Sequence, residues 1–451
     1  MSETTRRASR RDFLKGSATV AAGAALAGGL SIGRSAHAAG SDVIKACLIG
    51  CGGRGQGAIR NLLNVQDNIQ VIAVADAFES NAKGAVRGLK AEEAYKAKVD
   101  IPDDRIFWGL DAYQKAIASG VDLVVTAAPP GFRPIHYKAA VEAGKHVFME
   151  KPCCVDAPGF RSLMETNKLA EEKGLKVGVG LQRHHEPRYI ETIKRIHDGA
   201  LGDLMFQRVY WNGGGVWVRT REELAKHLGR TPTEMEYQVN NWYYFVWLSG
   251  DHICEQHVHN LDIANWVYNK AGDPKAAHPV EANGMGGRQV RKGKDVGQIY
   301  DHHYVEFTYA DGSKVFSQCR HIVNTWSPVM EHAHGTKGDS NCCGEINAPK
   351  KWRYHGANPN PYDQEHVDLV KAIRSGDKYH EGWHGAASSF TAVFGRMATY
   401  SGQVVKWDEA VEKGPNEMPK TFAWDAEPPV KPGPDGSYEH AVAMPGVYKA
   451  Y

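Results

Sequence analysis

Short apolar runs alternate with amphipathic segments over residues 43–150. Apolar runs of this length, bounded by glycine, proline or acidic residues, are typical of buried strands. The segments between them include helical patterns, such as residues 56–63 and residues 135–143, which Gly144 ends. Strands that alternate with helices predict a parallel, doubly wound sheet. The predicted strands cover residues 43–50, 69–75, 121–127 and 146–150.

A different pattern follows near residue 300. Residues 304–309 alternate between apolar and polar positions, and residues 314–319 alternate again after the turn Ala310-Asp311-Gly312. An Asp-Gly pair between two alternating runs is a strong hairpin signal, so we expect antiparallel sheet here. The tail from Gly414 onwards is rich in proline and glycine. We expect it to wrap over a surface, either its own or that of a neighbouring chain.

The first 38 residues have the pattern of an export signal. Residues 9–15, Ser-Arg-Arg-Asp-Phe-Leu-Lys, fit the twin-arginine pattern, and a mildly apolar run follows over residues 16–32. Ala36-His37-Ala38 is an A-x-A cleavage site. An uncleaved membrane anchor is the alternative, but about 17 glycine- and alanine-rich residues are short for a bilayer span. We therefore expect a periplasmic or otherwise exported protein without stable membrane insertion.

The composition is that of a soluble globular protein. Of 451 residues, 42% are hydrophobic and 24% charged, which excludes a wholly disordered chain. The formal charge is +2; without residues 1–38, 48 basic and 50 acidic residues remain, a charge of −2. Nothing in this balance points to a nucleic-acid partner. The eight cysteines include no C-x-x-C pair, and we expect small buried thiols rather than a disulfide framework.

A glycine-rich loop follows the first predicted strand. Residues 50–55 read Gly-Cys-Gly-Gly-Arg-Gly, which is G-x-G-x-x-G between a strand and a helix. Gly50 permits the tight turn, Gly52 lets a pyrophosphate approach the backbone, and Gly55 lets helix and strand pack closely. Asp76 ends the next strand, 21 residues after Gly55. A carboxylate there binds ribose hydroxyls and repels a 2′-phosphate, so the pattern predicts NAD, with NADP disfavoured.

Chemically reactive side chains are concentrated in two further places. Lys151 stands just past the fourth predicted strand, at the sheet edge where ligands bind in such folds. If residues 248–266 form one helix, His252, Glu255, His259 and Asp262 share a face. Glu255, His257 and His259 are all metal-ligand types. Because His257 would point away from that face, we predict no metal site.

The chain resembles the glucose–fructose oxidoreductase/inositol dehydrogenase family, Gfo/Idh/MocA, over nearly all of its length after the signal. The resemblance implies a dinucleotide-binding Rossmann domain followed by an α/β domain with an open, mostly antiparallel sheet that commonly forms a subunit interface. We therefore expect a signal over 1–38, a Rossmann domain over 39–152, a substrate and oligomerisation domain over 153–413, and an arm over 414–451. The motifs are the glycine loop, residues 126–129 with His136, residues 143–152 ending in Glu150-Lys151-Pro152, residues 335–338, 365–366, 372–376 and 395–398, and Trp407-Asp408.

The resemblance also implies roles for individual residues. His259 would be the base that removes an alcohol proton, Lys151 would stabilise the alkoxide, and Glu255 would orient the imidazole. The family more often has Asp at position 255, so Asp262 is the next candidate partner of the imidazole. The implied cofactor-binding residues are Gly50, Gly52, Gly53, Arg54, Gly55, Asp76, Pro129, His136, Glu150 and Lys151.

Aromatic and amide side chains before the catalytic segment suit a carbohydrate substrate. We expect Arg183, Trp242, Tyr243 and Asp262 to contact it. Three functions remain open: a sugar or cyclitol dehydrogenase or oxidoreductase, a glycosidase in which bound NAD transiently oxidises a carbon, and a non-catalytic cofactor-binding sensor. An exported enzyme would have to retain its NAD, and residues 39–42 or the tail past Gly414 could supply a lid.

Overall fold

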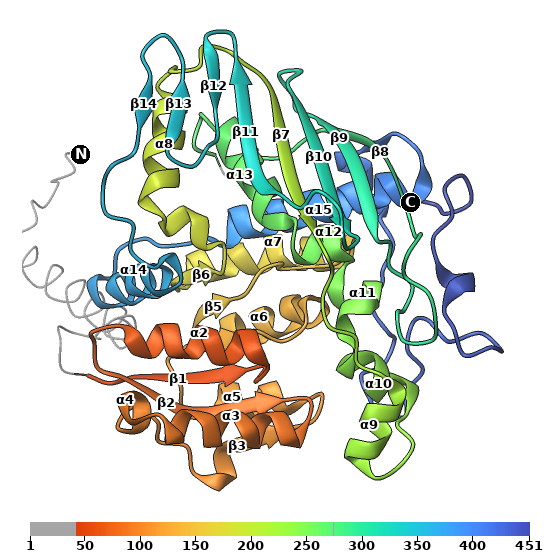
Figure 1. Cartoon of the computed structure of the whole chain (residues 1–451). Coiled ribbons are helices and arrows are strands. Elements are labelled where there is room, and N and C mark those ends of the chain that lie inside the picture. The colour runs from red at the N-terminus through yellow and green to blue at the C-terminus, as the bar shows by residue number, and fades with distance from the viewer. Residues whose placement is uncertain (1–41, 274) are drawn as a thin grey trace, which may run out of the picture.

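The computed structural model describes residues 42–273 and 275–451. The predicted export signal lies outside the described residues. Two sheets form two layers of the molecule, and helices α7, α13 and α15 lie between them (Figure 1). Within the described part of the chain, no helix combines the length and the apolar character needed to cross a bilayer.

The first sheet contains the four predicted strands and two more. All its strands are parallel, in the order β3-β2-β1-β4-β5-β6. The order reverses beside β1, so the glycine loop that follows β1 sits at the switch point where such sheets bind ligands. Its strands are β1 Ile44–Ile49, β2 Ile69–Asp76, β3 Ile106–Trp108, β4 Leu123–Thr126, β5 His146–Met149 and β6 Val177–Val179.

The sheet continues past residue 152, where the sequence places the domain boundary, because β6 pairs with β5. Helix α14, from the C-terminal part, also returns to this domain, and its Leu369 and Ile373 pack in the core beneath β1 and α2. The helices of this half are α2 Gly53–Asn64, α3 Glu79–Ala91, α4 Glu93–Lys96, α5 Ala112–Ala118, α6 Arg133–Glu142, α7 Ala157–Glu172 and α14 Pro361–Ser375.

The second sheet has the order β14-β13-β12-β11-β7-β10-β9-β8-β15, and every pairing except that of β7 with β10 is antiparallel. The predicted hairpin is confirmed, with Thr308 opposite Lys314. Its strands are β7 Leu204–Gly213, β8 Glu281–Gly287, β9 His302–Thr308, β10 Lys314–His321, β11 Val329–Gly335, β12 Gly338–Ser340, β13 Glu345–Asn347, β14 Trp352–Arg353 and β15 Val405–Lys406.

Helix α15 lies at the centre of the molecule. Its residues are buried on all sides except at His384, as expected for a helix packed between two layers. The remaining helices are α8 Pro187–His197, α9 Arg221–Leu228, α10 Glu234–Asn240, α11 Val246–Ser249, α12 His252–Glu255, α13 Val258–Tyr268, α15 Gly382–Ser401 and α16 Trp407–Lys413, with 3₁₀ turns η2 Asp103–Arg105, η3 Pro130–Phe132, η4 Gln182–His185, η5 Trp242–Tyr244 and η6 Glu439–Ala441.

Residues 248–266 do not form the single helix on which the shared face of residues 252, 255, 259 and 262 depended. Three helices occupy the segment, and the first break comes at Gly250 and Asp251, whose φ angles are +74° and +77°. The Asp251 carboxylate accepts a hydrogen bond from the backbone N–H of His252 at 2.5 Å, which starts α12 anew. A second break at Gln256 and His257 separates α12 from α13. The helical spacing between residues 252 and 262 is therefore interrupted.

The tail wraps over its own chain (Figure 1). Tyr438 is fully buried and meets Phe245 edge-on at 5.0 Å between ring centroids. The hydroxyl of Tyr300 donates to the carbonyl of Ala443 at 2.8 Å. All eight cysteines are free thiols, as expected, and seven of them are buried.

Candidate functional site

A cleft of about 370 Å³ lies between the glycine loop and the segment from Val216 to Gln256. Its floor is the C-terminal edge of the first sheet. One end lies at Asp76, and the other lies at Pro129, His136 and Glu255. This cleft has the position expected for a dinucleotide.

The glycines of the loop are required by close contacts. A Cβ on Gly55 would lie 1.8 Å from the carbonyl oxygen of Gly50, and Gly50 itself has a φ of +91°. A Cβ on Gly52 or Gly53 would meet no other atom within 4 Å, so the space beside these two glycines is open. Helix α2 begins at Gly53 without a side-chain cap, so its first N–H groups are free to bind an anion. The loop therefore fits a pyrophosphate.

Asp76 lies at the adenosine end of the cleft. Its carboxylate accepts hydrogen bonds from the backbone N–H of Cys51 at 2.7 Å, from that of Phe78 at 2.9 Å and from the Asn81 amide at 3.0 Å. Burial raises its pKa above the ordinary value, against these hydrogen bonds. Arg219, which lies over the Trp217 ring at 4.4 Å, approaches from the opposite wall. The carboxylate is fixed where ribose hydroxyls would bind.

Lys151 and Glu255 form a mostly buried ion pair. The distance from Lys151 Nζ to Glu255 Oε1 is 3.2 Å, and Nζ also donates to the backbone carbonyl of Glu255. Lys151 comes from the end of β5 and Glu255 from the end of α12, so the pair joins the two domains. The Glu255 carboxylate binds Lys151 and not the imidazole of His259. Among the described residues, no hydrogen bond joins Glu255 to His259.

His259 lies in the first turn of α13, and its ring stacks on Trp211 with 5.7 Å between centroids. Burial holds its pKa well below the ordinary value, and the charges of Lys151, Arg183 and Arg54 lower it further. Its Nδ1 is buried without a partner in the described part of the chain. His259 is therefore a neutral imidazole next to a cation, the form in which a histidine can accept a proton.

Four further cofactor candidates are Arg54, Pro129, His136 and Glu150. Arg54 lies 2.7 Å from Glu150, and its guanidinium stands over the Tyr362 ring at 5.1 Å. His136 lines the cleft with Pro129, and its Nδ1 lies 3.3 Å from the Thr126 hydroxyl. Burial lowers the pKa of His136 to about 3, with a smaller effect of Arg133.

The predicted substrate residues divide between two cavities. Trp242 and Tyr243 line the dinucleotide cleft. Arg183 lines a second cavity of about 590 Å³, where it pairs with Glu331 and donates to the His259 carbonyl at 3.1 Å.

Asp262 lines neither of these cavities. Its carboxylate lies 2.8 Å from His184 Nε2 and accepts a hydrogen bond from the Ser388 hydroxyl at 2.8 Å. Both carboxylate oxygens are thus engaged on the far side of α13. The expectation that Asp262 contacts substrate, or replaces Glu255 as the partner of His259, is not supported by this geometry.

Sequence reasoning missed several residues that the structure brings to the site. Asn81 carries a usable signal, since it stands one helical turn beyond Asp76. Gln256 has no sequence signal of its own, because it stands between two more reactive residues. Arg219 and Glu331 come from distant segments and carry no local signal at all.

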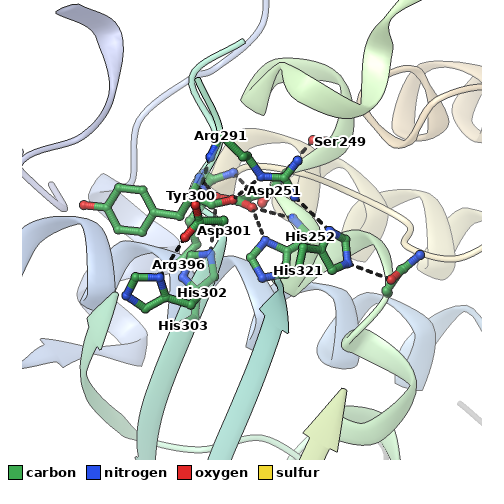
Figure 2. A network of polar contacts seen from close by, with 12 residues as sticks. Ser249, Asp251, His252, Arg291, Tyr300, Asp301, His302, His303, His321 and Arg396 are labelled. Carbon is green, nitrogen blue, oxygen red and sulfur yellow. Dashed lines mark hydrogen bonds and ion pairs between the residues drawn. The ribbon is translucent and has the colours of Figure 1, made fainter. Parts of the chain in front are cut away.

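The alternative of a metal at residues 255, 257 and 259 finds no support. His257 is buried, and its ring nitrogens lie 2.7 Å from the Ser317 hydroxyl and 3.3 Å from the Asn260 amide oxygen. In the described ranges, the metal-ligand types that come together are Asp251, His252 and His303. There the Asp251 carboxylate already accepts from the Tyr400 hydroxyl at 2.6 Å, within a wider polar network (Figure 2).

Comparisons with known proteins agree with this geometry. Residues 44–181 match the Gfo/Idh/MocA model, described as an oxidoreductase family with an NAD-binding Rossmann fold. Residues 8–27 match the twin-arginine translocation signal. The chain is 28% identical over 236 residues to an inositol 2-dehydrogenase/D-chiro-inositol 3-dehydrogenase of Lactiplantibacillus plantarum, which is 51% of this chain and 53% of that one.

The chain is also similar to a second curated relative and, in its fold, to a solved structure. The chain is 24% identical over 228 residues to the scyllo-inositol 2-dehydrogenase (NAD⁺) of Bacillus subtilis. The matched region makes up 50% of this chain and 54% of that one. The chain thus spans about half the length of the curated relatives it matches. An aldose-aldose oxidoreductase of Caulobacter crescentus shares the fold, with a TM-score of 0.61, 16% identity, and coverage of 81% of this chain and 100% of that one.

Proposed function

We propose that the protein transfers hydride between NAD and a hydroxyl of a sugar or cyclitol, because residues 44–181 match the model of the Gfo/Idh/MocA oxidoreductase family with its NAD-binding Rossmann fold. The observation that carries the proposal is the joint position of Lys151 and His259. Lys151 is paired with Glu255, which lines the dinucleotide cleft, and its charge acts on the buried ring of His259.

In this proposal, His259, Lys151 and Glu255 each have a separate role in the reaction. Bound NAD supplies the hydride acceptor when an alcohol is oxidised. His259 accepts the hydroxyl proton on its neutral imidazole. The ammonium group of Lys151 stabilises the negative charge that develops on the substrate oxygen, and Glu255 fixes the position of Lys151 through side chain and backbone.

The second cavity supports a carbohydrate substrate. Amide and aromatic side chains line it beside Arg183, an arrangement that binds hydroxyls and sugar C–H faces together. One of its lining residues, Arg183, donates to the backbone carbonyl of His259 and so connects this cavity to the proposed proton acceptor. The residues of this kind are Gln182, Tyr189, Asn341, Asn358, Asn360 and Tyr362.

A screen of sugars, cyclitols and glycosides tests the proposal. Cofactor reduction and product release are followed in the same samples. A dehydrogenase reduces NAD and forms a keto product. The alternative glycosidase releases free sugar with no net change of the cofactor, and a protein that does neither with any compound contradicts both.

We also propose that the cofactor stays bound between turnovers. Aromatic side chains of the tail pack against two residues that line the cleft: Trp424 lies 5.4 Å from Phe78, and Phe422 lies 5.8 Å from Phe132. Trp217 and Arg219 close the cleft from the second domain. Free NAD is scarce outside the cytoplasm, so an exported enzyme needs this retention, with nanomolar affinity or tighter.

The twin-arginine signal motivates a proposal about location. We expect the protein to be exported folded to the periplasm or an equivalent compartment, with NAD already in place. Replacing Arg10 and Arg11 together by lysine should leave the protein in the cytoplasm, as fractionation would detect. Replacing the non-motif pair Arg6 and Arg7 by lysine is the matched control. Unchanged export of the first variant would contradict the proposal.

We further propose a homo-oligomer through the second sheet. The face of this sheet away from α15 carries half-exposed or exposed side chains that alternate with the buried ones, among them Phe206, Tyr210, Met285, Tyr304 and Phe316. Such a face is suited to contact with a second copy. Light scattering after gel filtration gives the mass, and a monomer at micromolar concentration would contradict the proposal.

A further inference from the structure

A row of three side chains runs from the dinucleotide cleft into the core. Gln256 lines the cleft, and its Oε1 lies 2.9 Å from His321 Nε2. The other ring nitrogen of His321 lies 2.8 Å from Arg291 Nη2. The row comes from three separate segments, and Figure 2 shows His321 and Arg291 within the polar network around Asp251.

The chemistry of this row allows one arrangement of protons. A guanidinium can only donate, so Nδ1 of His321 must accept from Arg291. The proton of the neutral ring is then on Nε2, which must donate to Gln256. The carbonyl oxygen of Gln256 therefore faces His321, and its NH₂ group is directed away from the ring. The opposite orientation of the amide would place two donors against each other.

The row is anchored at its inner end. Arg291 donates from Nε to the carbonyl of Tyr300 at 3.1 Å, and its guanidinium lies over the Tyr244 ring at 5.0 Å. The Asp301 carboxylate accepts from the backbone N–H groups of residues 289–291. Arg291 can thus not move without breaking several other contacts.

The outer end of the row is free. Among residues 42–273 and 275–451, no hydrogen bond is found for the amide nitrogen of Gln256, and the side chain is partly exposed in the cleft. Gln256 follows Glu255, the partner of Lys151, and lies opposite the end marked by Asp76. The donor therefore points into the part of the cleft where the nicotinamide belongs.

We propose that Gln256 donates a hydrogen bond to the carboxamide oxygen of the nicotinamide, and that His321 and Arg291 are positioning residues that fix this donor. The inference rests on the proposed function, since it assumes the dinucleotide in the cleft. A fixed donor recognises a carbonyl and selects which way the carboxamide, and with it the ring, is turned.

The test compares two dinucleotides and one fragment. Reduced NAD and its 3-acetylpyridine analogue both carry a carbonyl, but the analogue has a methyl group in place of the amide NH₂. ADP-ribose lacks the nicotinamide. Protein loaded with each ligand is diluted, filtered after timed intervals and assayed for the ligand that it retains. The wild-type protein is expected to retain both dinucleotides.

Gln256→Glu gives the sharpest expected result. The glutamate carboxylate can still accept a hydrogen bond from His321, but it presents an acceptor to the cleft where Gln256 presents a donor. The carboxamide of NAD can turn its NH₂ group towards this acceptor, whereas the acetyl group cannot. Release of the analogue should therefore accelerate about tenfold more than release of NADH. Gln256→Met should accelerate both about equally, and ADP-ribose should be unaffected by either change.

The positioning residues have their own signature. Arg291→Met should let the proton of His321 move between the two ring nitrogens. The amide of Gln256 could then turn, and the preference of the cleft for a ligand carbonyl should weaken. Arg291→Lys retains a donor and should restore wild-type retention, which a merely structural role would not require. Gln403→Glu, at an exposed site, is the matched control.

Two results would overturn the proposal. One is wild-type retention of both dinucleotides by Gln256→Glu and Gln256→Met. The other is an equal loss of ADP-ribose, which would place the effect away from the nicotinamide. If NADH binds but no sugar is oxidised, the proposed function fails while the retention pattern still decides the role of Gln256.

Discussion

Replacing Lys151 by methionine is expected to lower kcat by about a hundredfold or more. The variant keeps the length of the side chain and removes the only cation that bonds Glu255 in the described part of the chain. The loss falls on kcat, because the ammonium group acts on charge that develops during the reaction. Steady-state kinetics with the substrate found in the screen measure it.

The matched control is Lys138→Met, since Lys138 forms an exposed pair with Glu142 at 3.9 Å. His259→Asn should lower kcat by a comparable factor because it removes the proton acceptor. Both active-site variants should still retain NAD, since neither residue belongs to the glycine loop. Normal turnover of either variant would place the acid–base chemistry elsewhere in the chain.

Unfolding should become much easier as the pH falls from 7 to 5. Burial is the first cause that lowers the pKa of several histidines, to about 3 for His257 and His366 and about 4 for His252 and His384. The unfolded chain takes up protons near pH 6.5, whereas the folded chain does so only near pH 3–4. Stability is therefore complete above pH 6.5 and is lost as the pH falls towards 4.

Other titratable groups either act outside this window or oppose the trend within it. His185 has its pKa raised to about 10, against the effect of burial, by Glu381 and Asp368, so its contribution is complete below pH 6.5 and lost only at alkaline pH. The pKa of Glu381 is lowered to about 2, against its burial, chiefly by His185, and its contribution is lost below pH 4.5. Between pH 7 and 5 the buried neutral histidines lower the stability, whereas Glu365 and Glu417, whose pKa values are raised chiefly by burial, oppose them.

His366→Phe isolates one of them. Its ring nitrogens have no partner among the described residues, and the ring packs on Phe148 at 4.1 Å. The loss of stability between pH 7 and 5 should shrink by about 2 kcal/mol in urea unfolding. His355→Phe, at an exposed site, should leave the slope unchanged. A pH dependence identical to that of the wild type in His366→Phe would contradict the assignment.

The sequence was most informative where the determining contacts are local. The glycine loop, Asp76 and Lys151 each lie next to a strand whose pattern is unmistakable, and the structure places all three along one edge of the sheet. The hairpin after Tyr309 was equally predictable, because Asp311 and Gly312 specify a turn between two alternating runs.

The sequence failed where contacts are remote or depend on backbone angles. The break before α12 requires a positive φ at Asp251, which is uncommon for aspartate and leaves no mark in the pattern. Asp262 had the right spacing for the catalytic face, but His184 and Ser388 bind it from positions 78 and 126 residues away. The role of Gln256 depends on His321, 65 residues distant.

The most direct test of the account is the dinucleotide content of the purified protein. The mature chain is isolated without added cofactor and denatured, and NAD and NADH in the supernatant are quantified against protein. The account predicts about one dinucleotide per chain, a fraction of which is reduced when the substrate is added before denaturation. An empty protein that shows activity only with millimolar NAD in the assay would contradict it.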